Sequence, residues 1–349
     1  PAIIDKEKRK MALKTAIVGC GRTANELHGP VLEKHPEFEV TAICDINQTA
    51  LNNYALRFPQ AAKYTDYHEM LSSEAFDFVV ILTYSYTHTA IALDFLRAGK
   101  HVLITKPWAI TVEEADSIIQ AAKQNHAIVM PFIPCHNGAD VEKIKEVVKA
   151  GTIGKVFRVY RAQMTFGKRS DWQTLKAYAG GYLNNWGPHI VEQVMHLVEE
   201  PIRTVYAQKR QIINPGDADD MFCSTMVTEN GIIVQVDHNI ISDYLPNWVV
   251  QGDKGTIYVK GNEMEVHEIS YPEADDPNCY RSVTHTEKTH ITLEGKIFGD
   301  HYEIYSMIAR TLHGEPYVVS LEYARHLTQI MQSIHKSADE GVLVKLNED

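Results

Sequence analysis

Short apolar runs alternate with amphipathic stretches over the first part of the chain. The runs TAIVGC, VTAICD, FDFVVILT, HVLIT and AIVMPFI consist almost entirely of aliphatic and β-branched residues. The segments between them have helical spacing, and we expect helices at 24–34, 49–58, 88–98 and 112–125. Apolar strands that alternate with helices are typical of a parallel sheet covered on both faces. The pattern therefore predicts a doubly wound α/β domain of the Rossmann type, which we place at residues 11–135.

The pattern changes after a further helix expected at 139–150. The strings KVFRVYRAQM, TVYAQKRQI, MFCSTMVTENGIIVQVDHNI and NWVVQGDKGTIYVKG alternate apolar and polar positions, as strands do when one face is buried. Asn230-Gly231 stands at a hairpin position in the third string. Helices expected at 302–312 and 321–338 complete this second domain, 136–349. The sequence thus predicts an α+β domain with an open, mostly antiparallel sheet.

Such an open sheet needs a cover on its second face. A second copy of the chain is the simplest cover, so we expect a homo-oligomer that forms through this sheet.

Size and charge narrow the classes of partner. A chain of 349 residues suits two domains. The net charge of -11 at pH 7, with no long basic run, argues against a nucleic-acid partner. No stretch approaches the roughly 18 apolar residues of a membrane span, and the charged start PAIIDKEKRKMALK is unlike a secretory signal. We therefore expect a cytoplasmic protein without a membrane partner.

The cysteines and histidines give no metal-ligand set by their spacing. The five cysteines are widely spaced and include no Cys-x-x-Cys pair. This arrangement predicts free thiols and no metal site.

A glycine-rich turn follows the first expected strand. The string AIVGCGRTANELH has Gly19, Gly21 and Ala24 in the spacing G-x-G-x-x-A, between a strand and a helix, with Arg22 and Thr23 in the same turn. Glycines there permit a tight turn and a close approach of the backbone to a pyrophosphate. These five residues are candidate cofactor-binding residues. Alone the string is a weak signal, and an ordinary strand-turn-helix junction is the alternative.

A carboxylate ends the second expected strand. Asp45 follows VTAIC, 24 residues beyond Gly21. A carboxylate at this point can accept the ribose hydroxyls of NAD and would repel the 2′-phosphate of NADP, and DINQ adds no basic side chain. The sequence therefore predicts NAD as the cofactor. An incidental Asp at the junction is the alternative.

Further polar groups stand where the third and fourth expected strands end. Thr83 and Tyr84 follow the third strand, and Lys106 follows the fourth. Ligands of open parallel sheets bind beyond these carboxyl ends, so we expect all three to face the nicotinamide half of a dinucleotide. We assign the neighbouring His88 and Trp108 to the cofactor site as well. A surface lysine before a turn proline is the alternative for Lys106.

Taken together, these strings resemble the Gfo/Idh/MocA oxidoreductases, the family of glucose-fructose oxidoreductase and inositol dehydrogenase. The resemblance rests on GCGRTA, on Thr83 to His88, on AGKHVL-x-x-KP up to Pro107, on G-x-IGKV from Gly151, and on GG…WGPH up to His189. It extends from about Lys14 to the final helix, and the motifs are specific only in combination. It implies a Rossmann domain, an oligomer formed through an open-faced sheet, and sugars or polyols as substrates.

The resemblance also implies a catalytic group. In the family, the lysine of a Glu-Lys-Pro motif, and an Asp and a His four residues apart, surround the reacting carbinol. Lys106 and His189 match the lysine and the histidine. Thr105 stands in place of the Glu, Asn185 in place of the Asp, and Tyr84 in place of a frequent proline. Asn185 lacks the negative charge of an Asp, which implies a weaker base at His189.

Oxidation of a secondary alcohol needs a hydride acceptor and a base within hydrogen-bond reach of the hydroxyl. Pro188 fits the first turn of a helix, which predicts His189 at its positive end as a neutral imidazole. One turn earlier, the amide oxygen of Asn185 could fix the ring tautomer. We expect Lys106, whose ammonium stabilises an alkoxide, to share the proton transfer. A helix-start residue bonded to a nearby carbonyl is the alternative for His189.

Tryptophans and a polar loop frame the expected substrate site. Trp172 and Trp186, like Trp108 and Trp248, lie beside motifs or in loops, and flat aromatic faces suit a pyranose. The loop GKRSDWQTLKAYAGG contains Asp171 and Trp172, which resemble a family element. His136 stands where several family members have an arginine, so we expect it to contact substrate. Ordinary packing for the tryptophans and a solvated loop are the alternatives, and we expect His196 to be structural.

Three hypotheses of function follow. The first is an NAD-dependent oxidoreductase that acts on a secondary hydroxyl of a sugar or glycoside, with C3 favoured because a ketone there acidifies the neighbouring positions. The second is an enzyme that cleaves a glycoside by transient oxidation without net redox. The third is a non-catalytic sensor of NAD or sugar, which Lys106 and His189 argue against and Asn185 leaves open.

Overall fold

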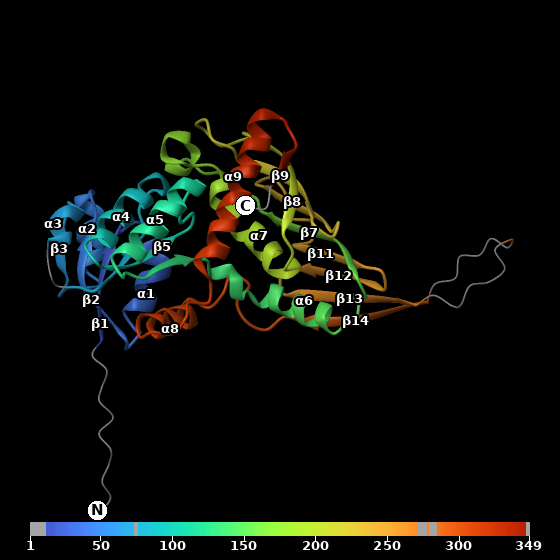
Figure 1. Ribbon diagram of the computed structural model, residues 1–349, viewed down its shortest axis with the longest axis horizontal. Coiled ribbons are helices and arrows are strands. Elements are labelled where there is room, and N and C mark those ends of the chain that lie inside the picture. Colours follow the sequence, from blue (N-terminus) through green and yellow to red (C-terminus); the bar gives the residue numbers. More distant parts are fainter. Residues whose placement is uncertain (1–11, 73–75, 271–277, 279–284, 347–349) are drawn as a thin grey trace, which may run out of the picture. The chain divides into compact units, whose positions relative to one another are not determined.

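The computed structural model (Figure 1) describes residues 12–72, 76–270, 278 and 285–346, so the expected boundary at Met11 and the cysteine at 279 lie outside the described residues. The chain divides into two compact units. The first unit runs to Phe132 and includes His301–Arg325, and the second consists of Ile133–Asp300 and the chain from His326 onward.

The first unit contains a six-stranded parallel sheet with the strand order β3-β2-β1-β4-β5-β6. The strands are β1 (Leu13–Val18), β2 (Phe38–Cys44), β3 (Ala62–Tyr64), β4 (Phe78–Ile81), β5 (His101–Thr105) and β6 (Val129–Phe132). This order is that of a dinucleotide-binding Rossmann sheet, and it reverses between β1 and β4. The predicted fold class of this half is confirmed.

One row of side chains crosses the middle of this sheet. Ile17 pairs with Ile43 on one side and with Val80 on the other, and the row continues through Leu103 to Met130. All five residues are fully buried in one hydrophobic cluster. Because both faces of the sheet are covered, every position in these strands can be apolar, which explains the unbroken runs in the sequence.

Helices follow the strands, and besides those expected at 49–58, 88–98 and 112–125 there are two short ones that were not predicted, at 67–71 and 85–87. They are α2 (Gln48–Ala55), α3 (Tyr67–Leu71), η2 (Ser85–Thr87), α4 (His88–Arg97) and α5 (Val112–Gln124). Side chains cap three of them at the start: Asn47 accepts from the N–H groups of Thr49 and Ala50, Asp66 from that of His68, and Thr111 from that of Glu114. The helix expected at 24–34 begins as a π-helical stretch, η1 (Ala24–His28), and continues as α1 (Gly29–Leu32).

Helix α8 (His301–Leu312) belongs to the first unit, whereas the sequence pattern placed it in the second domain. Its residues Ile304, Tyr305 and Ile308 lie in the same buried cluster as the central strands. The hydroxyl of Tyr305 is 2.8 Å from Nδ1 of His28. An amphipathic pattern predicts a helix but not its packing partner, which here lies almost 300 residues away in sequence.

The second unit contains a nine-stranded sheet in its described part, with the order β14-β13-β12-β11-β7-β10-β9-β8-β15. The strands are β7 (Val156–Met164), β8 (Ile202–Arg210), β9 (Met221–Thr228), β10 (Ile233–Asn239), β11 (Trp248–Gly252), β12 (Gly255–Lys260), β13 (Glu263–Ser270), β14 (His285–Thr292) and β15 (Val344–Lys345). All neighbours are antiparallel except β7 and β10, which run parallel. The predicted open, mostly antiparallel sheet is confirmed.

The two faces of this sheet differ. Inward positions such as Val159, Val236 and Trp248 are fully buried. Helices α6 (Ala139–Lys149) and α7 (Tyr182–Val198) belong to the same unit, as does α9 (Leu321–Glu340) from His326 onward, and α7 packs on β7, β9 and β10. The short helices η3 (Pro134–Asn137), η4 (Trp172–Thr174) and η5 (Lys176–Tyr178) complete the unit.

Outward positions line up across the strands of the second unit. The pairing register places Tyr206, Thr225, Gln235, Tyr160, Val249 and Tyr258 in one row. A hollow of about 320 Å³ on this face is lined by Arg158, Tyr160, Leu245, Pro246, Val249 and Gln251. Tyr206 and Tyr258 remain 43% and 38% exposed, so the single chain leaves large aromatic side chains uncovered here. None of the helices in the described ranges is long and apolar enough to span a bilayer.

Candidate functional site

The glycine turn after β1 is tight at Gly19 and open at Gly21. Gly19 has φ +99°, and a Cβ on it would lie 2.7 Å from the carbonyl carbon and oxygen of Leu82, so only glycine fits. Around a Cβ placed on Gly21, the described chain has no atom within 4 Å apart from the residue's direct neighbours. The Asn25 side chain donates to the carbonyls of Cys20 (2.9 Å) and Gly21 (3.0 Å) and so holds the turn. Sequence reasoning did not single out Asn25.

The Asp45 carboxylate lies against this turn. Its Oδ2 accepts the N–H of Cys20 at 2.7 Å, and its Oδ1 accepts that of Asn47 at 2.7 Å. Each carboxylate oxygen has a further lone pair, so ribose hydroxyls can still bond to it. The structure therefore brings Gly19, Gly21 and Asp45 together, as the sequence predicted, because β1 and β2 are neighbours in the sheet.

The other residues of the turn open the helical segment that follows. Arg22 is exposed and lies 3.5 Å from the Glu26 carboxylate, while Ala24 is fully buried beneath the turn. Thr23 makes no side-chain capping bond, so the first N–H groups of the segment are not capped by it. Together with the approach at Gly19 and the carboxylate of Asp45, this donor set fits a dinucleotide.

His88 joins the loops that follow β4 and β5. It is 1% exposed, with Nδ1 2.8 Å from the Pro107 carbonyl and Nε2 3.1 Å from the Thr83 carbonyl. Burial lowers the pKa of His88, while the contacts with the two carbonyl groups act in the opposite direction. His88 thus fixes the segment that carries Lys106 relative to Thr83.

Lys106, Tyr84 and Trp108 differ in their surroundings. Lys106 is half-buried directly after β5, and Tyr84 stacks on Tyr86 with ring centroids 6.2 Å apart. Trp108 is only 3% exposed, and its indole N–H donates to the Ala324 carbonyl at 3.2 Å. The structure therefore places Lys106 at the carboxyl end of β5 and Trp108 in the interior of the first unit.

Helix α7 starts earlier than the sequence indicated. It begins at Tyr182, after Gly181 with φ +105°. Asp219 caps it: the carbonyl accepts the N–H of Tyr182 at 2.9 Å and Oδ2 accepts that of Leu183 at 2.8 Å. The prediction that Pro188 opens the helix was wrong, because this capping residue lies far away in sequence and starts the helix two turns earlier. His189 is therefore inside α7, and no helix end acts on its ring.

His189 is flanked by a thiol and an indole. Its Nδ1 lies 3.0 Å from Sγ of Cys135, which is fully buried. The rings of Trp186 and His189 are 5.7 Å apart and inclined by 61°. Asn185 precedes His189 by four residues on α7, so both lie near one face of the helix. The structure thus groups His189, Asn185 and Trp186, and it adds Cys135, which sequence reasoning read only as a free thiol.

The loop between β7 and α7 is held by its own hydrogen bonds. Oδ1 of Asp171 accepts the N–H of Gln173 at 3.0 Å, and Oδ2 accepts Nε of Arg169 at 3.0 Å. The Arg169 N–H donates to the Asn214 side chain at 2.8 Å. Asp171 therefore pairs with Arg169 inside the loop, and Trp172 begins the short helix η4 beside it.

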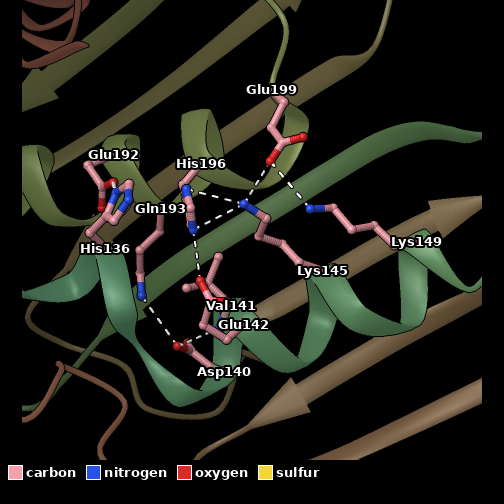
Figure 2. Close-up of polar contacts among 10 residues, drawn as sticks. All are labelled: His136, Asp140, Val141, Glu142, Lys145, Lys149, Glu192, Gln193, His196 and Glu199. Carbon is pink, nitrogen blue, oxygen red and sulfur yellow. Dashed lines mark hydrogen bonds and ion pairs between the residues drawn. The ribbon is translucent and has the colours of Figure 1, made fainter. Parts of the chain in front are cut away.

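His136 lies in a buried polar cluster (Figure 2). It is 9% exposed, and its Nδ1 is 2.6 Å from Oε1 of the fully buried Glu192. Its ring packs on that of His196 with centroids 3.9 Å apart. Nε2 of His196 is 2.8 Å from Oε1 of Glu142, and burial lowers the pKa of His196. His196 is thus part of the packing of α7 against α6.

This cluster includes the ligand types of a zinc site. Ligand atoms of His136, Glu192 and His196 lie within 4.8 Å of one another. Two imidazoles on one tetrahedral zinc ion diverge from it, whereas the rings of His136 and His196 approach each other to 3.9 Å between centroids at an inclination of 41°. The Lys145 ammonium also lies 3.3 and 3.1 Å from the two ring nitrogens of His196 (Figure 2). The contacts favour hydrogen bonding over metal ligation, although sequence spacing had missed the cluster altogether.

A second network, also made of hydrogen bonds, connects α7 to α6 and to the sheet of the second unit. The Arg161 side chain is fully buried and donates to Oε1 of Gln193 at 2.9 Å. Gln193 donates to Oδ1 of Asp140 at 3.3 Å, and the Trp248 indole N–H donates to Oδ2 at 2.7 Å. Trp248 is therefore a core residue of the second unit.

Both halves of the chain match known families. The family described as "Oxidoreductase family, NAD-binding Rossmann fold" matches residues 13–133. The family described as "GFO/IDH/MocA C-terminal domain" matches residues 141–258. The first match agrees with the glycine turn and Asp45, and it shows NAD to be the cofactor of this fold.

Several relatives span most of the chain or nearly all of it. The scyllo-inositol 2-dehydrogenase (NADP(+)) IolW of Bacillus subtilis is 24% identical, with 98% of each chain covered. An inositol 2-dehydrogenase of Salmonella typhimurium is 26% identical over 70% of this chain and 73% of its own. The structure of an NAD-binding protein from Listeria innocua superposes with a TM-score of 0.81 at 25% identity, over 95% and 96% of the two chains. The chain belongs to the GFO/IDH/MocA family of NAD-binding oxidoreductases.

Proposed function

We propose that this protein is an NAD-dependent dehydrogenase that oxidises a secondary hydroxyl of a polyol or sugar, with Lys106 and His189 handling the proton. The observation that carries the proposal is the position of Lys106 directly after β5, at the sheet edge that also carries the glycine turn and Asp45. The names of the relatives from Bacillus subtilis and Salmonella typhimurium support a cyclic polyol as the class of substrate.

The cofactor contacts follow from the first unit. Gly19, Gly21, Arg22, Thr23 and Ala24 would hold the pyrophosphate, and Asp45 the adenosine ribose. The Bacillus subtilis relative is named for NADP(+), but a carboxylate at the end of β2 favours NAD in this chain. Thr83, Tyr84 and Lys106 would lie toward the nicotinamide. His88 and Trp108 would not contact the cofactor directly but would hold in place the loops after β4 and β5.

The proton chemistry follows from the two candidate groups. The bound nicotinamide supplies the hydride acceptor. Nε2 of His189 would take the proton of the reacting hydroxyl. The Lys106 ammonium would stabilise the alkoxide as it forms. Asn185, as an amide, would orient the group without adding charge.

The remaining predicted residues would shape the substrate side. The Trp186 ring, next to His189, would pack on the apolar face of a sugar ring. Asp171 and Trp172 would line the site from the loop. His136 would contact the substrate only through its second ring nitrogen, because its Nδ1 already pairs with Glu192. For a sugar substrate, the oxidised position would be C3, because a ketone there acidifies the neighbouring positions.

The test is a panel of inositols, sugars and glycosides incubated with the protein and NAD. We expect NADH formation with at least one polyol or sugar, and a loss of kcat of about 10²-fold or more in Lys106→Ala and in His189→Gln. Deuterium placed at the oxidised carbon should appear on the nicotinamide. Turnover without NADH would instead indicate transient oxidation, and NAD binding without any turnover would contradict the proposal in favour of a sensor.

A further inference from the structure

Cys135 and His189 form a buried thiol-imidazole pair. Sγ of Cys135 lies 3.0 Å from Nδ1 of His189, although the two residues are 54 positions apart in sequence. The cysteine comes from η3 and the histidine from α7, and both elements belong to the second unit. A hydrogen bond at one ring nitrogen of histidine decides which nitrogen carries the proton. Cys135 is therefore placed to set the state of Nε2.

Polar residues along one face of α7 hold the His189 ring close to the sulphur of Cys135. His189, Glu192, Gln193 and His196 recur with the i, i+3, i+4, i+7 spacing of one helix face. Each contacts the segment formed by η3 and α6, and the partners are, in order, Cys135, His136, Asp140 and Glu142. Figure 2 shows the last three of these contacts. Because the three other contacts restrict the rotation of α7, His189 is held toward the sulphur.

Charge favours the sulphur as the acceptor in this pair. When His189 takes a proton it becomes an imidazolium, and the amide of Asn185 cannot stabilise that charge. A sulphur atom can, because it accepts N–H groups and can itself carry negative charge. The buried Arg161 guanidinium interacts electrostatically with Asp140 and with Cys135, so a positive charge acts on the sulphur and not only on the carboxylate.

We propose that Cys135 is a positioning residue for His189: its sulphur accepts the Nδ1–H, keeps Nε2 free of a proton in the resting enzyme, and stabilises the imidazolium. The proposal rests on the function proposed above. In the reaction, the O–H and C–H bonds of the carbinol would break, Nε2 would take the proton, NAD would take the hydride, and the C=O double bond of the ketone would form. No bond to sulphur is made or broken.

The direct test is nitrogen NMR of the NAD-bound protein labelled with ¹⁵N-histidine, in which the His189 signals are assigned by their loss in His189→Gln. We expect Nδ1 to be the protonated nitrogen in the wild type. Cys135→Ala should give a mixture of tautomers and a lower His189 pKa, whereas Cys135→Ser should keep the wild-type tautomer. Cys223→Ala, which removes a thiol on β9, should leave the spectrum unchanged.

The kinetic test uses the pH profile of kcat/KM with the best polyol or sugar. In Cys135→Ala we expect kcat to fall about tenfold, with KM for NAD unchanged and the acidic limb moved to lower pH. Cys135→Ser should restore much of the rate. If the alanine variant is unstable, Cys135→Val removes the acceptor while it fills the space.

Two results would overturn the proposal. One is a wild-type ring with its proton on Nε2, and the other is a His189 titration that is the same in the wild type and in the variants without sulphur. Both are read from the NMR signals alone. Failure of the proposed function would appear differently, as a wild-type protein that oxidises nothing in the panel while the NMR result still decides the role of Cys135.

Discussion

At the scale of single residues, Asp45 links the cofactor turn to the choice of cofactor. Its carboxylate bonds to the backbone N–H groups of Cys20 and Asn47 and is proposed to accept the ribose hydroxyls. We expect Asp45→Ala to weaken NAD binding by about 10- to 100-fold, since hydrogen bonds to a charged group contribute about 1.5–3 kcal/mol each. NADP binding should weaken less, because the repulsion of its 2′-phosphate is removed.

Titration of the protein with both dinucleotides, followed by calorimetry, measures this difference. Asp45→Asn is the matched variant: it keeps the size of the side chain and one acceptor oxygen for the turn but removes the charge. It should retain the fold and lose most of the preference for NAD. An unchanged preference in both variants would show that the cofactor is selected elsewhere.

At the scale of elements, the start of α7 depends on Asp219. This residue caps the first turn of the helix that carries Asn185, Trp186 and His189. Asp219→Ala should lower stability by about 1 kcal/mol and should also lower kcat, because the first turn frays. Asp217→Ala removes a comparable capping bond, from Oδ1 to the N–H of Lys176, outside α7. It should leave kcat near the wild type, and thermal unfolding together with steady-state kinetics would separate the two effects.

The same helix shows what the sequence could and could not predict. Strands and helices of the first unit are visible as apolar runs and amphipathic stretches because their burial is local and repetitive. The start of α7 is not visible, because it is set by Asp219, and a proline at 188 resembles a helix start. The contact of Cys135 with His189 and the packing of α8 are also invisible, since both join segments that only folding brings together.

At the scale of the whole molecule, buried histidines make stability depend on pH. Burial lowers the pKa of His28 to about 3 and those of His238 and His335 to about 4. These rings are neutral in the folded state but take up protons near pH 6.5 when unfolded. Their contribution is therefore fully present above pH 6.5 and is lost as the pH falls toward 4, by about 1.4 kcal/mol per pH unit for each ring.

We expect the melting temperature to fall steeply between pH 6.5 and 4. His238 stacks on Tyr182 and Trp186, so His238→Phe keeps an aromatic ring without a titrating group. This variant should lose less stability than the wild type over the same interval, as measured by scanning calorimetry. Parallel loss in the two proteins would mean that other groups govern the acid transition.

The outward face of the large sheet bears on assembly. Tyr206 and Tyr258 stand in one row of this face and are exposed in the single chain. We propose that a second copy covers them, and we expect Tyr258→Glu to reduce the assembled mass measured by light scattering. Leu56→Glu, on an exposed position of the first unit, is the control and should leave the mass unchanged. A wild-type protein that is already monomeric would contradict the proposal.

The place of α8 has a consequence for synthesis. A ribosome makes the six strands of the parallel sheet long before it makes Ile304, Tyr305 and Ile308, which complete the same core. The apolar surface of the parallel sheet that α8 covers therefore stays exposed in the nascent chain until residue 312 has left the exit tunnel. An early stop after Phe132 would release a polypeptide exposing that surface, a ready substrate for chaperones and proteases.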